Sequence, residues 1–112
     1  GHIDMGQIVR QAPSSVNSDE VYAVSTSASN VMAANTNRTS AILQNVGATK
    51  VYVRFGSAPV TGGTPRYSAI LAPSSGAAEG DGGSMTIDHF KGDIYVVCAS
   101  GSSTLIATEF IR

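Results

Sequence analysis

The stretch "NRTSAILQNVGATKVYVRFG", from Asn37 to Gly56, contains the clearest periodic pattern in the chain. Its second half alternates two kinds of position, with Val51, Val53 and Phe55 in one set and Lys50, Tyr52 and Arg54 in the other. Successive side chains of a β-strand point to opposite faces, so this alternation is the period of a half-buried strand. The stretch therefore predicts a strand with one apolar face and one polar face.

Further runs of strand character follow, separated by turn signals. We expect eight strands, at 21–26, 31–35, 38–45, 49–55, 67–72, 84–90, 93–100 and 103–111. No segment carries a helical apolar stripe over three turns, and β-branched residues, Ser and Gly dominate. The sequence thus predicts an all-β fold, an antiparallel β-sandwich of about eight strands. Its core-facing residues should include Val51, Val53, Phe55, Ile94, Val96 and Leu105.

Two short turns are well signalled. "NVGAT" at Asn45 to Thr49 and "SGS" at Ser100 to Ser102 each contain a glycine that can take a positive φ. We expect each turn to close an antiparallel hairpin between the strands that flank it. The longer connections at 56–66 and 72–83 are rich in glycine and polar residues, and loops of this length commonly contact a partner.

The N-terminal segment differs from the rest of the chain. Residues 1–5, "GHIDM", have the character of an expression-tag remnant followed by a start methionine. Residues 6–20 are polar and lack a period of 2 or 3.6, which predicts a flexible N-terminal arm before a sandwich domain at 21–112. We expect this arm to become ordered on a partner or a neighbouring subunit, and Arg10 is its candidate partner contact.

The balance of charges argues against two classes of partner. Without Asp4 of the remnant, seven Lys and Arg oppose seven Asp and Glu (8 − 1). A neutral, sparsely charged surface has no electrostatic footprint for a phosphate backbone or an anionic lipid headgroup, so we expect neither nucleic acid nor membrane as a partner. Cys98 is the single cysteine, which excludes an internal disulfide and favours a small buried side chain.

Acid–base and metal chemistry find little support in the sequence. Asp88, His89 and Asp93 form the one native acid–base cluster, but adjacent strand residues point to opposite faces, so Asp88 cannot orient His89. Glu79 and Asp81 lack the alternating ligands and closing Glu of a calcium loop. We therefore expect a non-enzymatic protein without metal or cofactor, and an acidic solvated loop around Asp81.

Arg38 and Arg54 are the best candidates for a partner contact. Across a hairpin centred on "NVGAT" they would lie near the same end of one sheet, where two like charges repel unless each has its own acceptor. One interpretation pairs them within the chain, with Asp93 or Glu109. In the other, at least one of them binds a neighbouring subunit or another partner, with Arg54 favoured, together with Tyr52 two residues before it.

The stretches "NRTSAILQNVGATKVYVRFGSA", "AILAPSSG" and "KGDIYVVCASGSSTLIATEF" together resemble a pattern found in small phage structural proteins. The similarity spans roughly Arg38 to Phe110, about two-thirds of the chain. It implies a virion β-sandwich of the capsid decoration, or cement, type. Such a protein would bind the major capsid protein on the outside of the particle as a homo-oligomer, with a trimer favoured. The alternative is a carbohydrate- or receptor-binding module of a phage tail or fibre, for which Tyr52 is the candidate stacking residue.

Overall fold

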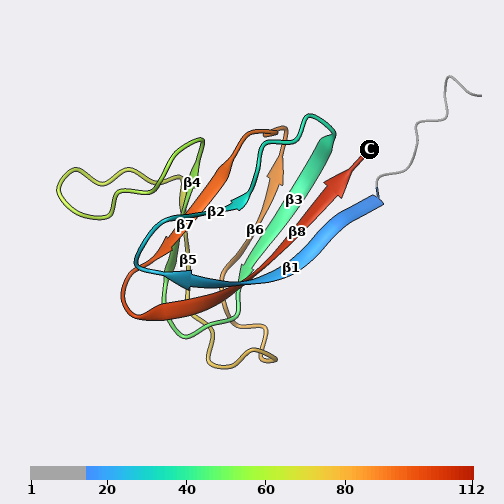
Figure 1. Cartoon of the computed structure of the whole chain (residues 1–112). Coiled ribbons are helices and arrows are strands. Elements are labelled where there is room, and N and C mark those ends of the chain that lie inside the picture. The colour runs from blue at the N-terminus through green and yellow to red at the C-terminus, as the bar shows by residue number, and fades with distance from the viewer. Residues whose placement is uncertain (1–14) are drawn as a thin grey trace, which may run out of the picture.

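The computed structural model describes residues 15–112, and these residues form eight strands in two antiparallel sheets, without a helix (Figure 1). The strands are β1 (Ser15–Ser25), β2 (Ser29–Met32), β3 (Arg38–Asn45), β4 (Val51–Phe55), β5 (Ala69–Leu71), β6 (Ser84–Asp88), β7 (Ile94–Cys98) and β8 (Ser102–Ile111). The all-β antiparallel sandwich predicted from the sequence is therefore confirmed. No helix long and apolar enough to cross a membrane occurs within the described residues.

The order of the strands defines the architecture. One sheet has the order β1-β8-β3-β6 and the other β2-β7-β4-β5. The first strand thus pairs with the last, the second with the seventh, the third with the sixth and the fourth with the fifth, all antiparallel. Four nested pairs divided between two facing sheets are the arrangement of an eight-stranded jelly roll.

The two hairpins predicted from the turn residues are wrong. "NVGAT" connects β3 in one sheet to β4 in the other, and "SGS" likewise connects β7 to β8 across the sandwich. After β3 the backbone stays beside β8, because the Val46 N–H donates to the Thr104 carbonyl at 2.9 Å. Gly101 takes a positive φ of 59°, whereas Gly47 does not and instead lies so close to Ser103 that a Cβ would clash. Both turns carry the chain to the opposite sheet. Ladder partners therefore come from distant parts of the sequence.

The sandwich begins earlier than the expected boundary at Val21. Residues 15–20 belong to β1, which pairs with β8 from Ser15 opposite Ile111 to Ser25 opposite Ser102. The pattern of burial explains why the sequence did not reveal this half of the strand. β1 is an edge strand, and most of its side chains are exposed, so no apolar alternation is needed. The rest of the expected arm, 6–14, and the remnant at 1–5 lie outside the described residues.

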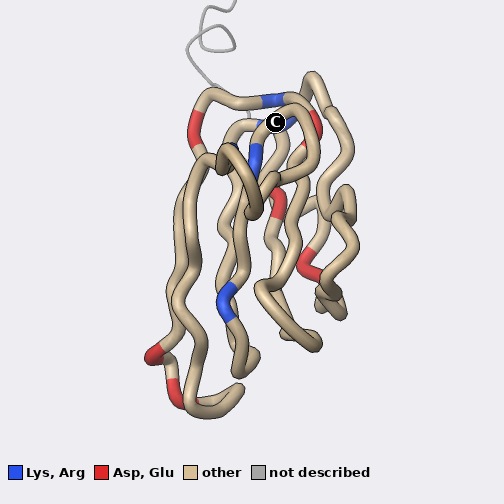
Figure 2. The backbone as a smooth tube through the Cα atoms, turned by 90° about the vertical axis from the view of Figure 1, so that its left-hand side faces the viewer, with Lys and Arg blue, Asp and Glu red and all other residues tan. Residues whose placement is uncertain are grey.

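The core lies between the two sheets. Of the six core residues predicted from alternation, five are fully buried: Val51, Val53, Ile94, Val96 and Leu105. The sixth, Phe55, is half-buried, packs against the core and stacks on Phe90 with ring centroids 5.0 Å apart. Cys98 is buried and free, as its sequence context predicted. Figure 2 shows that long stretches of both sheets carry no charged residue.

Candidate partner-binding faces

Arg38 is buried, with an exposed fraction of 1%. Its Nε donates to Glu109 Oε2 at 2.9 Å, and its Nη2 donates to the Ala33 carbonyl at 2.6 Å. Its Nη1 donates to the carbonyls of Phe90 at 3.1 Å and Gly92 at 2.9 Å. The intrachain pairing with Glu109 is therefore confirmed. The partner contact considered for Arg38 is not kept, because the guanidinium has no exposed surface to offer.

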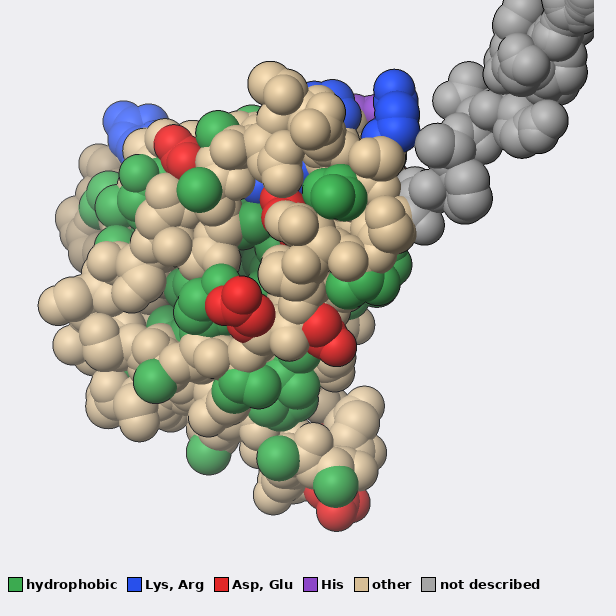
Figure 3. All heavy atoms as spheres, turned by 45° about the vertical axis from the view of Figure 1, so that its right-hand side comes forward, with side chains coloured by type: hydrophobic (Ala, Val, Ile, Leu, Met, Phe, Trp, Pro, Cys, Tyr) green, Lys and Arg blue, Asp and Glu red, His purple; other side chains and the backbone are tan. Residues whose placement is uncertain are grey.

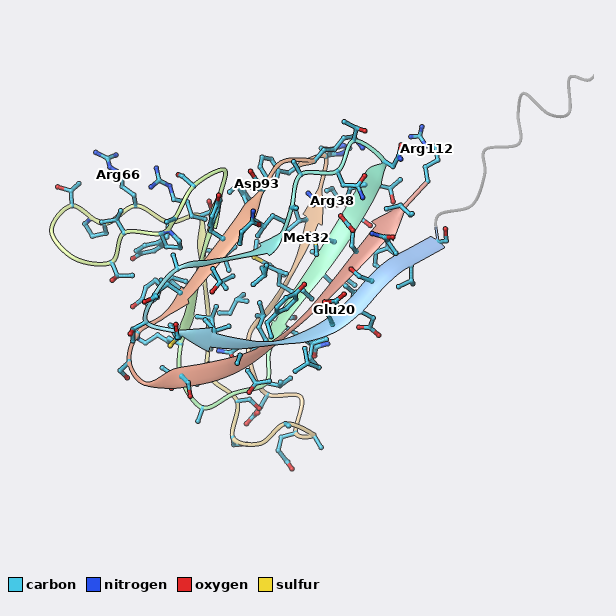
Figure 4. The ribbon with its side chains drawn as sticks, in the orientation of Figure 1. Glu20, Met32, Arg38, Arg66, Asp93 and Arg112 are labelled. Atoms are coloured by element: carbon cyan, nitrogen blue, oxygen red, sulfur yellow. The ribbon has the colours of Figure 1, made fainter. Side chains whose placement is uncertain are left out.

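We define the Arg38 cluster as Arg38, Glu109 and Asn17, which join separate segments of the sandwich. Arg38 is labelled in Figure 4 and is the first residue of β3. Asn17 Nδ2 donates to Glu109 Oε1, which connects the edge strand β1 to β8. The three carbonyl acceptors come from the β2–β3 and β6–β7 loops. A planar guanidinium with fixed donors suits such a set of acceptors, and each bond satisfies a donor of the buried guanidinium. The cluster is therefore a structural element of the jelly roll.

Asn45, at the other end of β3, also joins separate segments through the hydrogen bonds of a buried side chain. It is 1% exposed, and its Nδ2 lies within hydrogen-bond distance of the carbonyls of Thr49, Leu71 and Ala72. Its Oδ1 accepts from the Gly47 N–H at 3.0 Å and from Ser103 Oγ at 2.8 Å. Sequence reasoning took Asn45 for a turn residue. Its place on the inward alternation of β3, two residues after Leu43, was the signal for a buried amide.

Asp81 and Asp93 also have structural partners. The Asp81 carboxylate accepts hydrogen bonds from the Ser75 hydroxyl and N–H and from the Ser74 hydroxyl, and these bonds lower its pKa to about 2. Asp93 Oδ1 accepts from the Ala34 N–H and from Asn30 Nδ2, which lowers the pKa of Asp93. Asp93 therefore secures the end of β2. No three His, Cys, Asp or Glu side chains within residues 15–112 are grouped to hold a metal ion.

The outer surface of the β2-β7-β4-β5 sheet brings Tyr52 and Arg54 together with residues that sequence reasoning left out. The register places Tyr52 opposite Ile70 and Arg54 opposite Tyr95. Tyr67 contacts Tyr52 edge to face, with ring centroids 5.0 Å apart. We call this set the tyrosine face: Tyr52, Arg54, Tyr67, Ile70 and Tyr95.

Several polar groups of the tyrosine face have no partner within residues 15–112. The hydroxyls of its three tyrosines make no hydrogen bond there, and Arg54 uses one donor, Nη1, toward the Ala58 carbonyl at 3.1 Å. Tyr67 is 39% and Ile70 45% exposed. Arg54 lies on a different sheet from Arg38, so the shared ladder expected from the sequence is wrong. Tyr52 and Arg54 remain candidates for a partner contact.

The outer surface of the other sheet carries a second exposed set on three neighbouring strands. Val21 lies opposite Ile106, Asp19 opposite Thr108, and Val16 opposite Phe110, while Ile42 lies opposite Thr108 from the other side. We call this set the valine face: Val16, Asp19, Val21, Ile42, Ile106 and Phe110. Val16 and Val21 are 56% and 66% exposed. Figure 3 turns the right-hand side of Figure 1 forward and shows hydrophobic side chains in several separate groups, with acidic side chains beside some of them.

Comparison with known proteins adds no relative to these observations. No family model, curated protein or solved structure matches the chain. Arg10, the remaining partner residue predicted from the sequence, lies outside the described residues. The candidate site is therefore the pair of outer faces, built from side chains that the described chain leaves exposed or half-buried.

Proposed function

We propose that the protein is a non-enzymatic structural component of a phage virion. In this account it decorates and cements the outside of the capsid as a homo-oligomer, with a trimer favoured, and its partners are its own copies and the major capsid protein. The proposal joins the sequence resemblance to small phage structural proteins with a fold that recurs in viral capsid domains. Because the same fold also hosts lectins and other functions, the argument depends on the surfaces.

The observation that carries the proposal is that both outer faces of the sandwich expose large apolar side chains. Four of the five large hydrophobic residues that are most exposed lie on these faces: Val16, Val21, Tyr67 and Ile70. Apolar side chains grouped on a surface with few charges suit contact with protein. A subunit that lies between neighbours needs such surfaces on more than one side. The buried charges, by contrast, serve the fold through the Arg38 cluster.

The test uses particles assembled from a genome in which the reading frame of this chain has been deleted. Purified protein is mixed with these particles, and the bound fraction is measured by cosedimentation. We expect saturable binding, and we expect particles that already carry the protein to bind no more of it. Absence of binding to the deleted particles would refute the proposal.

A second candidate, a carbohydrate- or receptor-binding module of a tail or fibre, is favoured by a different feature of the tyrosine face. Its three tyrosine hydroxyls are unpaired within residues 15–112, and an aromatic ring with a free hydroxyl can both stack on a sugar and hydrogen-bond to it. A glycan array probed with the isolated chain separates the two functions. Selective glycan binding that Tyr52→Ala abolishes, without binding to deleted particles, would favour this candidate.

A further inference from the structure

The tyrosine face and the valine face carry charges of opposite sign. Arg54 is the one charged residue at the outward positions of β2, β4, β5 and β7, and the exposed Lys50 directly precedes β4 at the same alternation. The charged residues at the outward positions of β1, β3, β6 and β8 are Asp19 and Asp88, both acidic, with Arg112 following the end of β8. The chain has a formal net charge of −1, and of its two outer faces one carries only basic groups while on the other the two acids outnumber the one base.

None of these charges has an ionic partner among the described residues. The single ion pair of residues 15–112 is Arg38 with Glu109, in the interior. Arg54 donates only to a backbone carbonyl, and Asp19 Oδ1 accepts only from Thr108 Oγ1, at 2.9 Å. Each face also exposes apolar side chains beside its charges, with Ile70 on one and Val21 on the other. Surfaces of this kind are complementary to each other rather than to themselves.

From this complementarity we infer that a second copy of the chain is the partner of each face. The tyrosine face of one copy packs on the valine face of the next. The contact is heterologous, because it joins two different surfaces of the same molecule. Such contacts produce a ring when the rotation closes and an open stack of copies when it does not. This inference rests on the proposed function, because a closed ring is the homo-oligomer expected of a capsid decoration protein. The inference adds to the proposed function the identity of the two surfaces through which copies of the chain meet.

An interface of like with like is the competing arrangement. Two valine faces meeting through a two-fold axis would bring carboxylates to both sides of the interface, and two tyrosine faces would do the same with arginines. The tyrosine face supplies no acid of its own, and on the other face Arg112, beyond the end of β8, is the one base against Asp19 and Asp88, so a self-complementary contact leaves an excess of like charge. The heterologous arrangement gives each arginine a carboxylate across the interface and covers the exposed apolar residues of both faces.

The test is a charge exchange followed by sedimentation velocity of the full chain over a range of concentrations. The single variants Arg54→Glu and Asp19→Arg should each weaken self-association at least tenfold, equivalent to about 1.4 kcal/mol. The double variant, with both changes in one chain, should recover association because the two faces again carry opposite charges. Glu79→Arg is the matched control, since it makes the same change in charge as Asp19→Arg in the exposed β5–β6 loop.

Mixing the two single variants gives an additional and specific expectation. The tyrosine face of the Arg54→Glu variant is acidic and is complementary to the basic valine face of the Asp19→Arg variant. The unchanged valine face of the first variant is likewise complementary to the unchanged tyrosine face of the second. Mixed assemblies should therefore form by strict alternation, which a three-membered ring cannot satisfy. The mixture should give species with even numbers of subunits in place of the parent ring.

Three results would overturn the inference. These are a parent chain that stays monomeric at all concentrations, an Arg54→Glu variant that associates like the parent, and a double variant that does not recover. Particle binding separates these failures from failure of the proposed function. A monomer that still decorates deleted particles refutes the ring alone, and a ring that does not bind them refutes decoration alone.

Discussion

Substitution of Arg38 by methionine should be among the most destabilising changes available in this chain. The side chain is 1% exposed and makes four hydrogen bonds, one to Glu109 and three to loop carbonyls. Methionine fills much of the same volume but donates no hydrogen bond, which leaves the Glu109 carboxylate buried without its counter-charge. Loss of one partner of a buried ion pair costs about 3–5 kcal/mol. We expect a loss of this size in the free energy of unfolding.

Urea unfolding followed by far-UV circular dichroism measures the effect, and thermal unfolding provides a second reading. For a domain of this length, about 3 kcal/mol corresponds to a fall in Tm of roughly 12 °C or more. Arg54→Met is the matched control. It removes an arginine that makes one backbone hydrogen bond at the surface, and we expect a change within about 0.5 kcal/mol.

A double variant tests the reason for the loss. Arg38→Met combined with Glu109→Met removes the isolated carboxylate together with the guanidinium, so the double variant should be more stable than Arg38→Met alone. A loss below about 1 kcal/mol for Arg38→Met would contradict the structural role given to the cluster. Additive losses in the double variant would show that the unpaired charge is not the cause.

Three further changes test other parts of the fold. Asn45→Ala should lower the free energy of unfolding by about 2–4 kcal/mol, because three carbonyls, the Gly47 N–H and the Ser103 hydroxyl lose their partner. Gln44→Ala, on the exposed side of the same strand, should change it by less than about 0.5 kcal/mol in the same urea titration. Val53→Asp should cost several kcal/mol, because a fully buried position would receive an unpaired carboxylate, and a folded variant with unchanged stability would contradict the core assignment. The pKa of Asp81 is lowered from 3.8 to about 2, so its hydrogen bonds stabilise the folded state above the ordinary pKa and are lost as the pH falls through about 2. The difference in urea midpoint between the parent and Asp81→Asn should therefore shrink as the pH falls from 3.8 to about 2. A difference that stays constant over this pH range would argue against a stabilising role for the Asp81 carboxylate.

The positions of β3, β4, β7 and β8 could be predicted because they depend on local alternation. The alternation of apolar and polar neighbours predicts that Val51, Val53 and Ile94 are buried, and the structure places each of them in the core. The pairing of the strands could not be predicted in this way. It depends on contacts between distant residues, such as the Asn45 amide with the carbonyl of Leu71, and no local pattern distinguishes a turn that closes a hairpin from one that crosses to the other sheet.

The roles of the two arginines also depended on contacts between distant residues, which no local pattern reveals. Arg38 and Arg54 have similar local surroundings, each at the end of a run with strand character. What separates them is Glu109, which lies 71 residues after Arg38 in sequence and meets it in the core. Arg54 has no acid in the corresponding place and remains on the surface. The sequence therefore identified both residues as unusual, and the distant partner decided which was structural.

The edge strand was missed for a related reason. Residues 15–20 bury little of their surface, so they carry no apolar period, and their strand conformation comes from hydrogen bonds to β8. Asn17 adds a side-chain contact to Glu109 that only the fold brings within reach. A strand that is held mainly by backbone hydrogen bonds and buries few side chains shows little apolar alternation in its sequence.

The central claim is that the protein decorates the outside of a capsid, and cosedimentation with particles lacking it tests this claim most directly. The particles are titrated with the purified chain, and the number of bound copies per particle is read at saturation. The account predicts saturation at a fixed number divisible by the number of subunits in the oligomer. Binding that is absent, or that grows without reaching saturation, would contradict it.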